Sequence, residues 1–154
     1  MTRPENPAAG EEYVTLHIPS KYVYLRTVRQ LITDACNEAG MSEFNTAQLE
    51  MAVDESCSNI IEHGYGGESE AGSGLVESGI RINVVEDAGR IVVELYDRGT
   101  GFEFEEFQVL NPDEYLEEGH NRGLGMYIIK RFIDEISYEQ NGPRGNVLKL
   151  VKRT

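Results

Sequence analysis

The sequence has few cysteines, few basic residues and no long apolar run, and each shortage excludes a class of protein. The two cysteines, Cys36 and Cys57, both lie in helical patterns, which indicates buried, reduced thiols rather than a disulfide framework or a zinc site. Neither the polar start of the chain nor any later run has the length and hydropathy of a signal peptide or a membrane span. By default, we expect a cytoplasmic protein that makes no contact with a membrane.

Charge is strongly unbalanced toward the acidic side. The chain has 14 Lys and Arg against 27 Asp and Glu, a formal net charge of −13. Such a field repels a phosphate backbone, so direct binding to nucleic acid is disfavoured. It favours a basic protein partner, unless it serves only solubility. The 154 residues, 40% of them hydrophobic, suit one soluble domain with a real core.

Hydrophobic periodicity and turn residues predict one domain over 13–154, preceded by a flexible N-terminus over 1–12. A flexible connector is expected over 66–78 and a long acidic loop over about 102–122. The predicted elements are a strand at 13–18, a helix capped by Ser20 that runs to Ala39, a helix capped by Asn45 or Thr46 that closes at Gly64, strands at 79–85 and 90–96, a helix at 124–133, and strands at 135–140 and 146–151. Strands grouped in hairpins favour an α+β two-layer sandwich, with a mostly antiparallel or mixed sheet and helices on one face.

A polar stripe marks the second predicted helix. Glu55, Asn59 and His63 are spaced four residues apart, so on an α-helix they span only about 80° of arc. Leu49 and Val53 fall on roughly the opposite side, which suits a core-facing stripe. One helix thus offers a core to one side and a base, an amide and an imidazole to the other. A solvated polar face explains the stripe equally well on its own.

Two glycine-rich motifs follow at the ends of predicted elements. In the first, DRGTG, Asp97 follows a strand and can accept hydrogen bonds, while Gly99 and Gly101 allow close approach to a ligand. In the second, RGLG, Gly123 and Gly125 open an apolar helix, whose free N–H groups and positive dipole end suit a phosphate. Each motif alone has a bland explanation. The polar stripe and both motifs, in this order around an acidic loop, are far less expected by chance.

The combined motifs resemble the Bergerat ATP-binding fold of gyrase, MutL-type repair ATPases, histidine kinases and a heat-shock chaperone. The chain is most similar to the short branch of anti-sigma factor serine/threonine kinases, in AVDESCSNIIEHGYGG, LYDRGTGF, RGLGMYIIKRFIDEISYE and GNVLKLVK. The resemblance covers roughly Tyr13 to Lys152. One departure is Asn146, which follows Gly145 where the family often has a threonine.

The resemblance implies ATP and Mg²⁺ as cofactors and gives three residues a role in phosphoryl transfer. Glu55 resembles the general base that takes the proton from an attacking hydroxyl. Asn59 resembles the residue whose side-chain oxygen holds Mg²⁺ against the phosphates. Arg122, at the edge of the predicted ATP lid, resembles a group that neutralises charge on the transferred phosphoryl group.

The remaining implied residues bind the nucleotide. Asp97 resembles the aspartate that accepts from the exocyclic amine of adenine, with Gly99 and Gly101 making room for the base. His63 matches the end of the helical motif, and packing or capping is an equal alternative for it. Backbone N–H groups for the phosphates are implied at Gly123, Leu124, Gly125 and Met126.

Several functions are compatible with this set of residues. The first expectation is an anti-sigma factor that phosphorylates Ser or Thr of an anti-anti-sigma antagonist and sequesters a sigma factor. The resemblance is compatible with a homodimer, since relatives commonly dimerise. The main alternative is an ATP-gated partner-binding module without significant kinase activity. A detached histidine kinase domain is disfavoured, because His17, on a strand, is the only histidine before Glu55. A gyrase-like hydrolysis cycle is disfavoured because no transducer domain is expected.

Overall fold

The computed structural model describes residues 13–69, 78–101 and 124–154, with only the backbone of Leu124. The predicted N-terminus and most of the predicted connector and lid lie outside these ranges. In chain order the elements are β1 (Tyr13–Pro19), a 3₁₀ turn η1 (Tyr22–Tyr24), α1 (Leu25–Glu38), α2 (Glu43–Asn59), a π-helical turn η2 (Ile60–Gly64), β2 (Gly79–Asp87), β3 (Arg90–Asp97), α5 (Leu124–Phe132), β4 (Glu135–Gly142) and β5 (Gly145–Arg153). None of the helices in the described ranges is long and apolar enough to cross a membrane.

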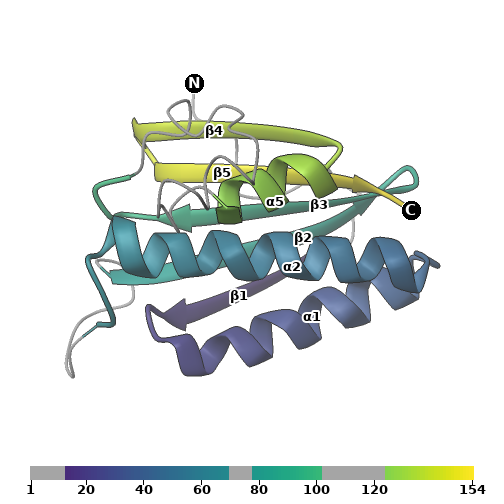
Figure 1. The fold of residues 1–154 in the computed structure, drawn as a ribbon, viewed down its shortest axis with the longest axis horizontal. Helices are drawn as coiled ribbons and strands as arrows, with labels where there is room; N and C mark the ends of the chain where they lie inside the picture. Colours follow the sequence, from purple (N-terminus) through teal and green to yellow (C-terminus); the bar gives the residue numbers. More distant parts are fainter. Residues whose placement is uncertain (1–12, 70–77, 102–123) are drawn as a thin grey trace.

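The strands form one antiparallel sheet in the order β1-β2-β3-β5-β4. Both predicted hairpins are present, as β2–β3 and β4–β5. The helices lie together on one face of the sheet (Figure 1). The predicted α+β two-layer sandwich is therefore confirmed.

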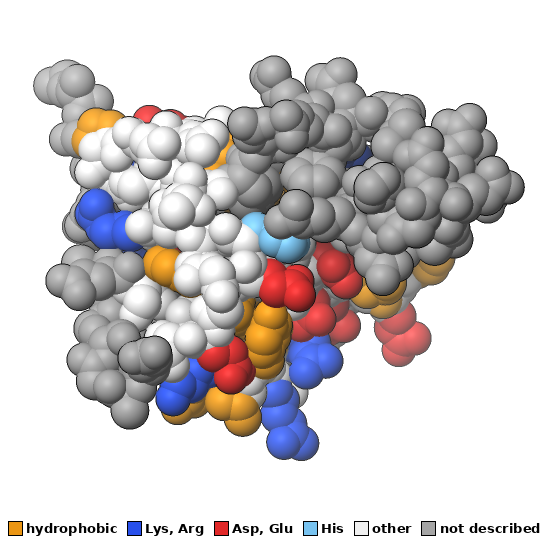
Figure 2. Space-filling model, turned by 60° about the vertical axis from the view of Figure 1, so that its left-hand side comes forward, with side chains coloured by type: hydrophobic (Ala, Val, Ile, Leu, Met, Phe, Trp, Pro, Cys, Tyr) orange, Lys and Arg blue, Asp and Glu red, His pale blue; other side chains and the backbone are white. Residues whose placement is uncertain are grey.

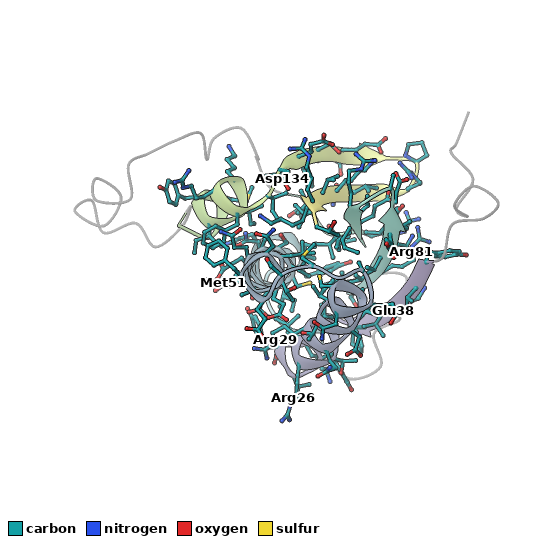
Figure 3. All side chains as sticks on the ribbon, turned by 90° about the vertical axis from the view of Figure 1, so that its right-hand side faces the viewer. Arg26, Arg29, Glu38, Met51, Arg81 and Asp134 are labelled. Atoms are coloured by element: carbon teal, nitrogen blue, oxygen red, sulfur yellow. The ribbon has the colours of Figure 1, made fainter. Side chains whose placement is uncertain are left out.

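Alternation along the strands separates a buried face from an outer face. On β2 and β3, for example, Ile82 pairs with Leu95, and both are fully buried beneath the helices. In the end-on view of Figure 3, Met51 lies on the outer side of α2, whereas Arg81 lies on the opposite side of the molecule, beyond the sheet. The largest fully buried side chains are Ile32, Leu49, Ile60, Ile61, Ile80, Ile82, Ile91, Leu95, Met126, Ile129, Leu148 and Leu150.

Both predicted helix caps are wrong. The first helix begins at Leu25, after η1, whose N-cap position is Lys21. Ser20 is instead fully buried, and its carbonyl accepts from the backbone N–H of Ser69. The second helix begins at Glu43, because Ser42 supplies an earlier cap: its Oγ accepts from the N–H of Asn45 at 3.1 Å.

A buried lysine fixes the far end of α5 to the sheet and to α2. The ammonium of Lys152 on β5 donates to Oε1 of Gln48 at 2.7 Å and to the carbonyl of Phe132 at 2.6 Å. Phe132 is the last residue of α5, where a cation is favourable to the helix dipole. These bonds define where α5 lies, and so where its first turn points.

Candidate functional site

Four parts of the chain meet at one end of the molecule: the end of α2 with η2, the end of β3, the start of α5 and the start of β5. This end lies at the left of Figure 1. Figure 2 turns it forward and shows Asp and Glu side chains gathered next to a histidine ring. The polar stripe and both glycine motifs predicted from the sequence belong to these segments.

The start of α5 lies directly against the polar stripe of α2. A methyl group built on Gly125 would lie 2.5 Å from Oε2 of Glu55 and 3.8 Å from Nδ2 of Asn59. A larger residue at this position would displace the carboxylate of Glu55, so Gly125 leaves that side chain its place beside the first turn of α5. Three residues predicted from two separate motifs are therefore neighbours in space.

The carboxyl group of Glu55 is poised to be a better base than an exposed glutamate. Burial raises the pKa of Glu55, and the nearby charges of Asp54 and Glu62 raise it further. A higher pKa means that the carboxylate holds a proton more strongly once it has taken one. Its position beside the first turn of α5 places this base where a helix N-terminus can hold an anion.

A π-helical turn ends α2 and changes the position of His63. The N–H of Tyr65 bonds the carbonyl of Ile60 at 3.0 Å, a five-residue separation. The stripe predicted for an α-helix therefore holds for Glu55 and Asn59 but is rotated at His63. Nε2 of His63 lies 3.8 Å from the carboxylate of Glu62, and the His63 carbonyl accepts from the hydroxyl of Thr100 at 3.2 Å.

Asp97 ends β3 on the helix-facing side of the sheet, directly opposite Asn146 on β5. Its Oδ1 accepts from the N–H of Gly99 at 2.9 Å and from Nδ2 of Asn146 at 3.0 Å. The side chain of Asn146 also donates to the Gly99 carbonyl at 3.0 Å and accepts from the N–H of Asn141 at 2.9 Å. The hydrogen bonds that Asp97 accepts from the described residues thus use Oδ1, which leaves Oδ2 for a ligand.

Burial and hydrogen bonding shift the pKa of Asp97 in opposite directions. The residue is 5% exposed, and burial raises the pKa of its carboxyl group. The bonds from Asn146 and Gly99 act in the opposite direction and lower this pKa, by a smaller amount. Without those two donors the ionised form would be still less favourable.

The turn after β3 is fastened to the π-helical turn by backbone contacts. The N–H of Thr100 bonds the carbonyl of Gly64 at 2.8 Å. A methyl group built on Gly99 would lie 2.5 Å from that same carbonyl oxygen. Gly99 therefore lets two segments of backbone meet, and the meeting holds Asp97 beside the end of α2. Gly101 has φ +77° and lies against the side chain of Gln140.

Tyr65 adds a second fastening at this point. Its hydroxyl donates to the carbonyl of Gly79 at 2.7 Å, where β2 begins, and accepts from the N–H of Arg98 at 2.9 Å. One phenol therefore joins the π-helical turn to the start of β2 and to the residue after Asp97. The backbone around Asp97 is held from both sides.

We expect Tyr65→Phe to loosen the turn that carries Asp97. The substitution leaves the Gly79 carbonyl and the Arg98 N–H without their partner, which should lower the free energy of unfolding by about 1–3 kcal/mol. ATP affinity should fall with it, because the turn no longer holds Asp97 in one place. Chemical denaturation and calorimetric titration with ATP measure the two effects. Tyr96→Phe is the matched control, since that phenol lies away from the helices and bonds Glu94; equal losses in both variants would contradict the expectation.

The other predicted site residues are only partly placed. Arg122 and Gly123 lie outside the described residues. Leu124 begins α5, and Met126 is 2% exposed with its side chain in the core, so the backbone of this turn is what faces the site. The first turn of α5 lies beside Glu55 as the motif predicts, and the nucleotide contacts assigned to it stay a prediction.

Two residues of the site were missed by the sequence reasoning. The motif pattern marks Asn146 only as a departure from the family, and it indicates no role for Tyr65. A signal for Asn146 was present: hairpins β2–β3 and β4–β5, if neighbours in one sheet, bring the start of β5 beside the end of β3. The bonds of Tyr65 depend on the π-helical turn, which has no recognisable pattern in the sequence.

The sequence matches the family model of the histidine kinase-like ATPase domain over residues 18–152. The chain belongs to this family. Membership implies that the site takes ATP, and it accounts for a polar helix facing the glycine-rich start of another helix. The resemblance inferred from the motifs is thereby confirmed.

Relatives of this ATPase domain include named kinases. It is 27% identical over 134 residues to the serine-protein kinase RsbW of Bacillus velezensis, covering 84% of this chain and 79% of the relative. The RsbW serine-protein kinase of Bacillus subtilis is 26% identical over the same shares.

Solved structures share the fold. The RsbU and RsbW domains of Rv1364c from Mycobacterium tuberculosis match with a TM-score of 0.61 at 17% identity, over 92% of this chain and 32% of that longer chain. The SiaB–SiaC complex from Pseudomonas aeruginosa matches with a TM-score of 0.58 at 13% identity, over 92% of this chain and 89% of the other. A histidine kinase domain from Erythrobacter litoralis matches with a TM-score of 0.51 at 15% identity, over 88% and 61%.

Proposed function

We propose that this domain transfers the γ-phosphoryl group of ATP to a Ser or Thr hydroxyl of an anti-anti-sigma antagonist, and that it also binds and sequesters a sigma factor. The observation that carries the proposal is the contact between Glu55, Asn59 and Gly125: a base and an amide lie against the first turn of a helix. Relatives named serine-protein kinases support the same reading. Phosphoryl transfer needs mainly positioning and electrostatic stabilisation, which this arrangement offers.

The nucleotide would lie between Asp97 at the end of β3 and the first turn of α5. Oδ2 of Asp97 would accept from the exocyclic amine of adenine, and the free N–H groups of the first turn of α5 would receive the phosphates. The hydroxyl of the protein substrate would then approach Glu55. Because the carboxylate accepts a proton more readily than usual, it can remove the hydroxyl proton as the hydroxyl oxygen bonds to the γ-phosphorus and the bond from that phosphorus to the oxygen of the leaving ADP breaks.

Magnesium fits the donors present at Asn59. Mg²⁺ in nucleotide sites is commonly held by phosphate oxygens, water and one or two protein oxygens rather than by a protein cage. Among the described residues there is no group of three or more His, Cys, Asp or Glu that could hold a metal ion. The side-chain amide of Asn59 lies beside the first turn of α5, and its neutral oxygen would be the protein ligand there. When bound, the ion would supply positive charge to the phosphates, and Asn59 would orient it.

The proposal is tested by transfer of label. The protein is incubated with γ-labelled ATP, Mg²⁺ and antagonist-type proteins encoded by the same genome, and each is separated and counted. We expect label on one antagonist, lost when its acceptor Ser or Thr is changed to Ala. Binding of ATP and of an antagonist without any label would contradict the kinase and favour the ATP-gated binding module.

Sigma-factor binding is a separate part of the proposal. The net charge of −13 suits a basic docking surface on the sigma factor, so association should slow as salt rises. Analytical ultracentrifugation of the protein, with and without a sigma factor, would show whether it binds as a homodimer. Rates that do not change with salt would remove charge steering from the proposal.

A further inference from the structure

The side chain of Asn146 is fully buried, and all its hydrogen-bonding partners are within the protein. The N–H of Asn141 can only donate, so it fixes Oδ1 of Asn146 on that side. The amide nitrogen must then face Asp97 and Gly99, and each of its two hydrogens has an acceptor at 3.0 Å. Asn146 is therefore held as a donor toward Asp97.

Only one oxygen of the Asp97 carboxylate accepts hydrogen bonds from the described residues. Its Oδ1 receives two donors, from Gly99 and Asn146, so the plane of the carboxylate is set by two points. Its second oxygen, Oδ2, is then directed as an acceptor with its lone pairs free of these bonds. An acceptor held in this way suits a purine whose ring edge carries an amine and disfavours one that carries a carbonyl oxygen.

We propose that Asn146 is a positioning residue that orients Asp97 and thereby sets the preference of the site for a 6-amino purine over a 6-oxo purine. The inference rests on the proposed ATP site and adds the residue that gives that site its selectivity. A threonine at this position has one hydroxyl hydrogen and can satisfy Asp97 or the Gly99 carbonyl, not both. Asparagine satisfies both, which explains how the chain departs from the common pattern without losing the hydrogen bond to Asp97.

The electrostatic effect has the same direction. Burial raises the pKa of Asp97, and the two groups that lower it are the amide of Asn146 on β5 and the N–H of Gly99. Among these, the bond from Asn146 lowers the pKa of Asp97 and so helps to keep the carboxyl ionised. A protonated Asp97 could donate to the oxygen of a 6-oxo purine, so loss of Asn146 should weaken the rejection of that base.

The test uses Asn146→Thr and Asn146→Val, which have nearly the same shape and differ by one hydroxyl. The dissociation constants of ATP and of inosine triphosphate, which has a 6-oxo group in place of the amine, are measured calorimetrically for each. For Asn146→Val we expect ATP affinity to fall about 10- to 100-fold, because a hydrogen bond to a charged group is lost. The affinity for inosine triphosphate should fall less, so the two dissociation constants become more similar and the preference for ATP decreases. Asn146→Thr should recover a substantial part of both the affinity and the ratio.

Val147→Ala is the control for general weakening of β5, since Val147 is buried on the other face of the strand. It should lower thermal stability without changing the ratio between the two nucleotides. Circular dichroism first checks that Asn146→Val is folded. The inference is overturned if this variant keeps the parental ratio of the dissociation constants for ATP and inosine triphosphate. It is also overturned if Asn146→Thr and Asn146→Val have the same two dissociation constants. Failure of the proposed ATP site gives a different result, because the parent protein would then bind neither nucleotide or fail to discriminate between them. Failure of the kinase alone appears only in the label-transfer experiment and leaves the two dissociation constants unchanged.

Discussion

Glu55→Gln is expected to bind ATP about as tightly as the parent protein but to phosphorylate its antagonist at least about 100-fold more slowly, the usual contribution of a positioned general base. Glutamine keeps the shape of the side chain and the packing against Gly125, so the nucleotide site stays formed. It cannot take a proton from the attacking hydroxyl. The substitution should therefore lower the rate constant of phosphoryl transfer measured in a single turnover, with little change in the dissociation constant of ATP.

The pH dependence gives this prediction a second readout. Because burial raises the pKa of Glu55, the parent enzyme should lose activity as the pH falls through that raised value, at a higher pH than an exposed glutamate would allow. The residual activity of Glu55→Gln should lack this decline. Glu62→Gln is the matched control: its side chain is 62% exposed and its charge contributes to the shift of Glu55. It should move the decline slightly to lower pH and leave the maximal rate nearly unchanged. A Glu55→Gln variant as fast as the parent would remove Glu55 from the reaction.

Much of the fold could be predicted because its signals are local. Alternating Ile and Val residues on both sides of a turn predict the β2–β3 hairpin, which the structure confirms. The strands run further than predicted, to Asp87, so that Asp87 pairs with Arg90 across a two-residue turn at Ala88 and Gly89. The contact of Glu55 and Asn59 with Gly125 could be predicted only through resemblance, since no local pattern says that α2 and α5 are neighbours. Once the family is recognised, the two motifs fall on facing helices.

The parts that could not be predicted depend on competition between distant or nearly equal alternatives. Ser42 and Asn45 are both good N-cap residues, and the earlier one prevails because it lengthens α2 by a further turn. The π-helical turn at Ile60–Gly64 has no residue signature, and it is stabilised by partners at the start of β2 and in the turn after β3. The role of Asn146 depends on Asp97 lying opposite it on the neighbouring strand, and these two residues are 49 positions apart in the sequence.

Asp97→Asn is expected to abolish useful ATP binding while leaving the fold at least as stable as that of the parent. An asparagine in the same place still accepts through Oδ1 from Gly99 and Asn146. Its Nδ2 replaces the free Oδ2, so a donor would face the donor amine of adenine. A site that presents the wrong polar group to its ligand loses affinity by about 100-fold or more. Inosine triphosphate, whose 6-oxo group is an acceptor, should lose much less.

The stability expectation follows from the sign of the pKa shift. Folding raises the pKa of Asp97, so the stabilising contribution of this carboxyl group is fully present below the unfolded-state pKa and is lost as the pH rises through the folded-state value. At neutral pH the ionised, buried carboxylate therefore opposes folding, and Asp97→Asn removes that opposition. Thermal unfolding at several pH values should show an advantage of the variant at neutral pH that shrinks in acid. An Asp97→Asn variant that binds ATP normally would exclude Asp97 as the adenine acceptor, whereas one that fails to fold would show that the carboxylate serves structure. The predicted combination, a more stable protein without its nucleotide, would identify Asp97 as a residue kept for binding at the expense of the fold.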